Sequence, residues 1–286
     1  MINRAAYVVL ATSLSALYQL SSAGLALAQA VPGQHWGIHG QYDAELPPPA
    51  IEGKAGEKDP AALSEIREFA ASTTPSGWRG IEANGTLLVG DGQTIKEFPA
   101  SLIVQSGAKY RLDVTAGSAA SSVRVNGLVG VRQQSNGTLQ RLNVTLLDSP
   151  FFVPSELLEI ANRANISVVD DGQIQIEKRT MHKITLVIPA VSANMAQPIT
   201  NGSAFAVGLY FDPVKHYLLK KVMVGHYPGQ ASRQFLQVTT YNDYRQMQGA
   251  IVPFVISQTN NGQHGMTFKA TDLSETARHE ESYFRF

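Results

Sequence analysis

The chain has 286 residues, and its 23 Lys and Arg residues balance its 23 Asp and Glu residues. Charged residues make up 16% of the chain, against about 25% in an average soluble domain. No run of Lys or Arg is longer than a pair, so the sequence lacks the basic stripe that is typical of nucleic-acid-binding proteins. The chain contains no Cys, which excludes disulfide bonds, thiol catalysis and attachment of a lipid to a cysteine.

Residues 1–30 are typical of a secretory signal peptide. Arg4 forms a short basic start, residues 5–17 are mostly apolar, and Ala-Gln-Ala at 28–30 fits a cleavage site. A membrane anchor is the alternative, but it needs about 20 continuous apolar residues, and polar side chains interrupt this run from Tyr18 onward. We therefore expect export to the periplasm, a mature chain that begins at Val31, and no transmembrane segment in that mature chain.

Residues 31–58 have the composition of an unstructured tail or linker, with three consecutive prolines at 47–49. Helical signals follow at once. Asp59 suits the capping position, Pro60 suits the first turn, and the next apolar residues repeat at helical spacing. The spacing predicts a helix over residues 60–71, and a similar pattern predicts a second helix from Pro154 to about Asn165.

From Gly77 the apolar pattern changes to a period of two, which is typical of half-buried strands. Asn-Gly pairs and short Asp-containing sequences between these runs suit tight turns, because they tolerate positive φ angles. We predict turns at 84–85, 126–127, 136–137, 201–202, 261–262, 170–172 and 212–213. The sequence therefore predicts one mainly β (α+β) domain over residues 59–286. We expect eight to eleven strands in a strongly curved antiparallel sheet, forming an incomplete β-barrel covered by two or three short helices.

The order of motifs in this domain carries a family resemblance. In the C-terminal half, a strand leads into an Asp-Pro turn, and Asp243-Tyr244-Arg245 leads through Gly249 to a strand that contains Pro253. In the N-terminal half, residues 100–104 and 109–114 form an expected hairpin. This order resembles the periplasmic lipoprotein-carrier family, the outer-membrane lipoprotein-sorting proteins of the LolA/LolB-like superfamily.

The resemblance covers residues 60–286 and implies a half-open β-barrel, with helices as a lid over an apolar cavity for acyl chains. The sequence departs from the family pattern in three places. The tail at 31–58 and a segment at 189–203 are additional, and the arginine that locks the family's lid matches no single position here.

An acyl chain offers no polar group to recognise, so its site needs only dry apolar surface. We expect the ligand-cavity side chains to be Phe151, Phe152, Leu112, Phe205, Phe211, Leu236, Val238 and Phe254. The first two precede the second helix, where an apolar loop at a barrel mouth would contact cargo. A filled β core would show the same alternation, so an envelope structural or protein-interaction domain is the alternative function.

No sequence pattern indicates catalysis, a cofactor or a metal site. Residues 116–120 come nearest to the Gly-x-Ser-x-Gly nucleophile turn, but have Ala at both Gly positions. His35 and His39 are the one closely spaced histidine pair, and their place in the tail favours a polar tail over a metal site. Asp243-Tyr244-Arg245 favours packing of a hairpin end over paired-carboxylate chemistry.

We therefore expect a non-enzymatic periplasmic carrier. Its expected partners are the acyl chains of a lipoprotein or lipid, or an envelope protein, and not nucleic acid. An exported hydrolase is the third hypothesis.

Overall fold

The computed structural model describes residues 56–286, except residues 74–77, 91–93, 118, 128, 144–146, 148, 177, 190–203 and 228–229. Several predictions made from the sequence lie outside these residues: the signal peptide, nearly all of the 31–58 tail, the His35/His39 pair and the turn at 201–202. Among the helices that are described, none combines the length and the apolar character needed to cross a membrane.

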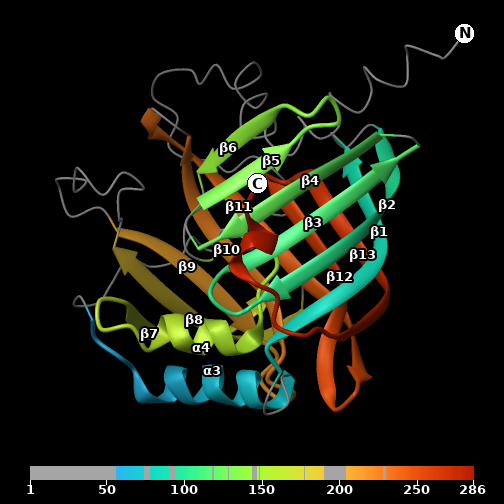
Figure 1. Cartoon of the computed structure of the whole chain (residues 1–286). Helices are drawn as coiled ribbons and strands as arrows, with labels where there is room; N and C mark the ends of the chain where they lie inside the picture. Colours follow the sequence, from blue (N-terminus) through green and yellow to red (C-terminus); the bar gives the residue numbers. More distant parts are fainter. Residues whose placement is uncertain are drawn as a thin grey trace, which may run out of the picture.

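One antiparallel sheet of 13 strands forms the body of the domain (Figure 1). In chain order the strands are β1 (Gly80–Gly90), β2 (Ile95–Gln105), β3 (Lys109–Ala116), β4 (Ala119–Asn126), β5 (Val129–Gln133), β6 (Leu139–Asn143), β7 (Ser167–Ile176), β8 (Arg179–Pro189), β9 (Ala204–Phe211), β10 (Leu218–Tyr227), β11 (Gln230–Met247), β12 (Ala250–Asn260) and β13 (Gln263–Glu275). Their order across the sheet is β6-β5-β4-β3-β2-β1-β13-β12-β11-β10-β9-β8-β7. β6 and β7 stand at opposite ends of this order, so the barrel is incomplete. The predicted fold class is confirmed, with more strands than expected.

The chain enters this sheet at its middle and finishes beside its own entry point. β1 and β13 pair with each other, and β2 to β6 extend the sheet outward on one side. The chain then passes through the segment before α4 (Pro154–Ala161) to reach β7 at the far edge, and β8 to β13 return to the middle. This path obliges the connection between β6 and β7 to cross the domain.

Helix α3 (Pro60–Thr73) precedes β1 and packs against α4 (Figure 1). The Asp59 carboxylate accepts hydrogen bonds from the backbone N–H groups of Ala61 at 2.8 Å and Ala62 at 3.2 Å, which is the predicted cap. Both predicted helices are confirmed, although α4 ends at Ala161, before Asn165.

A third short helix, η1 (Glu281–Phe284), contacts β3 and β4. It lies on the face opposite to the core, because its Tyr283 ring meets Arg111, which alternates along β3 with the buried Leu112.

Four predicted turns lie where expected. Gly127 and Gly137 have φ angles of 65° and 83° between successive strands, and Asn261 and Gly262 have φ angles of 48° and 74° between β12 and β13. The Asp212 carboxylate accepts backbone hydrogen bonds at 3.0 Å in the turn between β9 and β10. These are the positions at which positive φ angles or Asp capping are required.

Two predicted turns are wrong, because the strands continue through them. The pairing of β1 with β13 shifts register between Asn84 and Gly85, and the pairing of β7 with β8 shifts between Asp170 and Gly172. Both sites are β-bulges: the extra residue is Thr271 on β13 in the first and Asp171 on β7 in the second. Gly-containing sequences occur at bulges as well as at turns. Local composition therefore could not separate a bulge from a hairpin.

Gly85 on β1 supplies a stability test of the bulge opposite it, where β13 carries the extra residue Thr271. A Cβ atom at this position would lie 2.1 Å from the backbone oxygen of Lys269 on β13, so any side chain must push the two strands apart. We expect Gly85→Ala to lower the free energy of unfolding by about 3 kcal/mol, measured by chemical denaturation. The control is Gly117→Ala, which meets no atom within 4 Å and costs only the backbone strain of its positive φ, about 1 kcal/mol. Equal losses in the two variants would contradict the close approach at Gly85.

Candidate functional site

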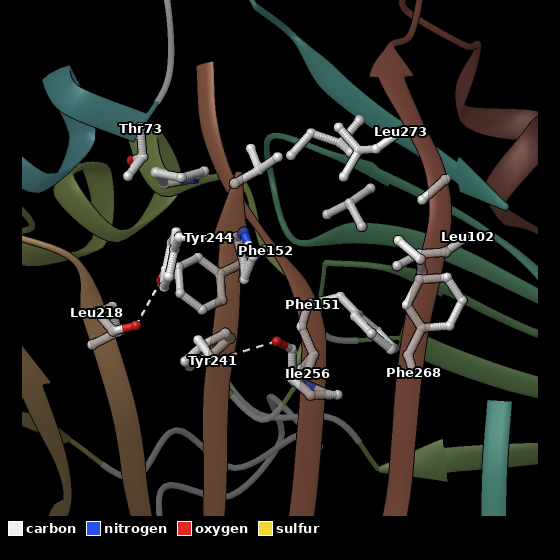
Figure 2. A pocket seen from close by; sticks show the side chains of 18 of the residues that line it. Thr73, Leu102, Phe151, Phe152, Leu218, Tyr241, Tyr244, Ile256, Phe268 and Leu273 are labelled. Carbon is white, nitrogen blue, oxygen red and sulfur yellow. Dashed lines mark hydrogen bonds between the residues drawn. The ribbon is translucent and has the colours of Figure 1, made fainter. Parts of the chain in front are cut away.

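An apolar cavity lies between two halves of the core. One half is built on β1 to β4, β12 and β13, and the other combines α3 and α4 with β7 to β11. Ile256 on β12 packs against both halves and lines the cavity (Figure 2). The lining residues are Phe69, Thr73, Ile81, Ala83, Leu102, Val104, Pro150, Phe151, Phe152, Pro154, Leu218, Tyr241, Tyr244, Val252, Pro253, Ile256, Phe268, Ala270 and Leu273.

Phe151 and Phe152, which precede α4, place their rings on opposite sides of this junction. The Phe151 ring meets the rings of Tyr110 and Phe268 edge-on, with centroids 5.9 and 5.8 Å apart. The Phe152 ring meets Tyr241 edge-on at 5.8 Å. Such edge-to-face pairs contribute about 0.5–1.5 kcal/mol beyond their burial. The segment before α4 thus joins the two halves of the core where they meet at the cavity.

Two side chains from the sheet hold this segment by its backbone. The Lys221 ammonium on β10 donates hydrogen bonds to the backbone oxygens of Leu147 and Ser149, and the residue is only 1% exposed. The Tyr241 hydroxyl donates to the backbone oxygen of Pro150 at 3.2 Å. The buried carbonyls of this non-helical segment are therefore satisfied by the sheet beneath it.

The cavity presents hydrocarbon with its polar groups already engaged. Three described lining residues carry hydroxyl groups, and each donates to a backbone carbonyl: Thr73 to Phe69, Tyr241 to Pro150, and Tyr244 to Leu218 at 2.6 Å (Figure 2). Burial raises the pKa of both tyrosines well above the ordinary value, so both remain neutral. Among the described lining residues none is charged. A ligand inside would find mainly dispersion contacts, and no hydroxyl of the described lining has its O–H group free.

The cavity volume is about 60 Å³. One water-sized group needs about 10–15 Å³ by the same measure, so the space accepts about four to six such groups. A short hydrocarbon segment fits as the structure stands. A longer chain requires side chains to rotate or the covering helices to move.

The structure places five of the expected cavity residues in the core around this space. Phe151 and Phe152 line the cavity. Leu112, Phe254 and Phe211 are buried within the two core halves, at 3%, 3% and 0% exposure, but are not part of the lining. Phe211 instead packs edge-on against Phe69 of α3, with ring centroids 5.6 Å apart.

Leu236 and Val238 lie elsewhere, and this corrects their expected position. They belong to a third buried cluster, together with Tyr210 and Val222. Tyr210 alternates along β9 with residues of the helix-covered core half, so the third cluster occupies the other face of the sheet. The sequence correctly predicts that residues alternate along β11. Leu236 and Val238, however, lie on the face of the sheet opposite to the expected one. The Phe205 side chain lies outside the described residues, although its backbone pairs with Ile188.

Much of the lining was not anticipated from the sequence. Phe69 and Thr73 come from the end of α3, and Leu102, Phe268 and Leu273 come from strands that meet only through the β1–β13 pairing. The alternation of apolar residues in the sequence predicts that these side chains are buried. It does not predict whether a buried side chain lies beside a cavity. Asp243-Tyr244-Arg245 lies within β11, close to its turn with β12. There Tyr244 faces the cavity, while Arg245 pairs with Asp243 at 2.5 Å.

The described residues contain no group of three or more His, Asp or Glu side chains arranged to hold a metal ion.

Comparison with known proteins shows which fold this architecture resembles. No protein-family model matches the chain, and no curated protein matches it. Three solved structures superpose on more than three-quarters of it. A domain from Vibrio parahaemolyticus described as an outer membrane lipoprotein-sorting protein has a TM-score of 0.52 and 13% identity, over 78% of this chain and 96% of its own. The chain has a LolA-like fold.

Two further structures agree with this assignment. A LolA superfamily protein from Nitrosomonas europaea has a TM-score of 0.50 and 11% identity, covering 79% of this chain and 97% of its own. A DUF1329 family protein from Desulfovibrio piger has a TM-score of 0.51 and 6% identity, covering 79% and 96%. The resemblance noted in the sequence is thereby confirmed at the level of the LolA-like fold.

Lys221 allows a direct test of how the segment before α4 is held. We expect Lys221→Met to leave the carbonyls of Leu147 and Ser149 buried without a donor and to lower the free energy of unfolding by about 3 kcal/mol. Chemical denaturation followed by tryptophan fluorescence measures this loss. Lys269→Met on the exposed side of β13 is the control, with an expected change within about 0.5 kcal/mol. A Lys221 variant as stable as the control would show that the ammonium does not hold the segment.

Glu156 makes the stability of α4 depend on pH. The residue is 5% exposed. Burial raises its pKa to about 7, despite a backbone hydrogen bond from Ala108. A raised folded-state pKa stabilises the protein below the unfolded-state value of about 4.5, and this contribution is lost as the pH rises through about 7.

We expect Glu156→Gln, which keeps a hydrogen-bond acceptor and removes the charge, to raise the free energy of unfolding by about 2–3 kcal/mol above pH 7. Near pH 4 it should change the free energy by less than about 0.5 kcal/mol. Urea denaturation across this pH range measures both values. Glu159→Gln, at an exposed position on the same helix, should give no such pH-dependent gain. A constant difference between wild type and Glu156→Gln at all pH values would contradict the buried-carboxylate interpretation.

Proposed function

We propose that this protein is a carrier-like binding protein of the cell envelope that holds an acyl chain of a lipid or lipoprotein in its cavity, without catalysing a reaction. The observation that carries the proposal is the cavity itself. It lies between two separately packed core halves, its described lining is uncharged, and every hydroxyl in that lining is engaged by a backbone carbonyl. Such a surface is suited to hydrocarbon.

Energetics favour a ligand longer than the present space. Burying one methylene group contributes about 0.8 kcal/mol, so a segment of about four to six groups contributes about 3–5 kcal/mol before the cost of binding. Useful affinity therefore needs a longer chain that extends beyond the present hollow. The non-strand elements beside the cavity, α3 and the segment before α4, are the parts able to make room.

The LolA-like neighbours support this choice of ligand class. One of them is described as a lipoprotein-sorting protein of the outer membrane. The signal-peptide pattern of residues 1–30 supports a place in the periplasm, where a carrier of this kind would meet exported lipoproteins.

Binding of a fluorescent fatty acid tests the proposal. We expect purified, delipidated protein to bind cis-parinaric acid with about one-to-one stoichiometry. Ala270→Phe places a ring in the cavity lining and should weaken binding at least about tenfold, a change of about 1.4 kcal/mol. Ala120→Phe adds the same ring at an exposed position of β4 and should leave binding unchanged. Mass spectrometry of an organic extract of the native protein would identify the chains that it carries.

Two results would overturn the proposal. If neither cis-parinaric acid nor extracted lipid is found with folded protein, the cavity is only a packing defect. The remaining interpretation is then an envelope protein-interaction domain. If binding occurs but Ala270→Phe and Ala120→Phe are indistinguishable, the ligand occupies another surface. Turnover of ester substrates by the purified protein would favour the exported hydrolase instead.

A further inference from the structure

An unbroken row of alternating carboxylates and histidines joins α3 to the sheet. Glu65 on α3 places one carboxylate oxygen 2.9 Å from His216 Nδ1 and the other 3.4 Å from His182 Nδ1. His182 Nε2 on β8 continues to Asp170 of β7 at 2.8 Å. His216 Nε2, in the turn before β10, continues to Glu68 of α3 at 3.2 Å. One helix is thus tied to β7, β8 and the turn after β9. We refer to these five residues as the latch.

The geometry favours the doubly protonated form of the two imidazole rings. In both imidazoles, each ring nitrogen faces a carboxylate oxygen. A neutral imidazole has only one N–H, so its other nitrogen would direct a lone pair at a negative oxygen. Only the imidazolium form can donate from both nitrogens. Loss of one proton per ring therefore turns one contact per ring from attractive to repulsive.

Because Glu65 and His182 are mostly buried, their contacts help to hold α3 against the sheet. The side chains of Glu65 and His182 are 10% and 17% exposed, so water screens their charges poorly. Within the described part of the chain, both ion pairs of Glu65 are made with these two histidines. If both histidines were neutral, a mostly buried carboxylate would lose its cationic partners, which is costly.

The electrostatics of His182 agree with the geometry. Burial disfavours the charged imidazole, but the hydrogen bonds and negative charges of Asp170 and Glu65 outweigh it and raise the pKa of His182. A raised folded-state pKa means that the stabilisation is complete below the unfolded-state value of about 6.5. It is lost as the pH rises through the higher folded-state value.

We propose that the latch is a proton-dependent closure that holds α3 against the sheet in mildly acidic conditions and releases it as the pH rises above neutral. This inference rests on the proposed function, because Phe69 and Thr73, which follow Glu65 and Glu68 along α3, line the cavity. The present space accepts only a short hydrocarbon segment, so a longer chain must displace part of its cover. Release of α3 at its polar side would lower the cost of that displacement.

Two acidic groups near the latch already have basic partners. On β7 and β8, Asp171 pairs with Lys183 at 3.0 Å. Beside the β9–β10 turn, Asp212 pairs with Arg179 at 2.8 Å. β12, which also contacts α3, carries no charged residue.

Helix α4, which packs against α3, carries the pH-sensitive Glu156 and the exposed Glu159. Burial raises the pKa of Glu156, so its stabilising contribution, like that of the latch, is lost as the pH rises. The experiment must separate Glu156 from the latch.

Hydrogen exchange of the α3 amides, expressed as protection factors, measures release directly in the full chain. We expect protection over residues 60–73 to fall at least about tenfold between about pH 6 and about pH 8.5, the factor that one pKa unit represents. Association of N-phenyl-1-naphthylamine, an apolar probe that stays uncharged over this range, should accelerate by a similar factor. His182→Gln/His216→Gln should abolish both dependences and leave α3 poorly protected at both pH values.

Three comparison variants complete the test. His264→Gln removes a histidine of β13 that contacts only Thr267 among the hydrogen bonds described, and should retain the wild-type pH dependence. Glu156→Gln should retain it as well, because it leaves the latch intact. Glu65→Gln removes the central charge from the helix side and should abolish the dependence even if the double histidine variant does not fold.

The outcomes separate the latch from the binding function. Unchanged α3 protection across pH in a protein that binds the probe overturns the latch and leaves the proposed function standing. Loss of the pH dependence in Glu156→Gln, with retention in His182→Gln/His216→Gln, also overturns the latch. Absence of probe binding at both pH values, with pH-dependent protection of α3, supports the latch but overturns the proposed function.

Discussion

The concave apolar face of an unclosed sheet has to be covered, and this requirement shapes the molecule. A closed barrel would fill or enclose its interior with strands alone, whereas here β6 and β7 end at opposite edges of a 13-stranded sheet. Helices α3 and α4 and the segment before α4 provide the cover. Glu57 and Asp59, just before α3, make backbone hydrogen bonds to Val168 of β7, but the helices themselves do not share the sheet's hydrogen-bond ladder. They are held by side-chain packing and by a few polar contacts, chiefly from Lys221, Tyr241 and the histidines that face Glu65. The cavity lies where this cover meets the two core halves.

Topology explains why aromatic side chains occupy the junction. The chain builds one half of the sheet outward from β1 and must then reach the opposite edge to begin β7. Its connection carries Phe151 and Phe152 between the core halves, where one ring packs toward Phe268 and the other toward Tyr241. The described residues of this connection need partners for their carbonyls, because they form no helix or strand before α4. Lys221 and Tyr241 provide those partners from strands that were laid down later in the chain. Cavity and cover are therefore consequences of one chain path.

The sequence was sufficient for the class of fold and for both helices, because these depend on local periodicity and on caps such as Asp59. It was insufficient wherever two distant strands decide the outcome. Gly85 and Gly172 have the sequence context of turns but lie beside β-bulges, since only the partner strand determines whether the chain reverses. Leu236 and Val238 alternate correctly and still face away from the cavity. The latch was invisible, because Glu65, His182 and His216 are far apart in sequence and acquire meaning only when β7 to β10 pack beneath α3.

The charged side chains that support the cover lie outside the lining of the cavity. An interior that offers only hydrocarbon and occupied hydroxyls cannot itself respond to pH, so any control of access by protons must act on the supports of the cover. Two such supports are sensitive to protons, Glu156 on α4 and His182 beneath α3. Protonation neutralises a buried carboxylate and charges a histidine between carboxylates, and in both cases the protonated form favours the folded contact. Raising the pH therefore weakens the attachment of both helices in the same direction. The two helices that cover the apolar face would loosen together, while the sheet beneath them keeps its backbone ladder intact.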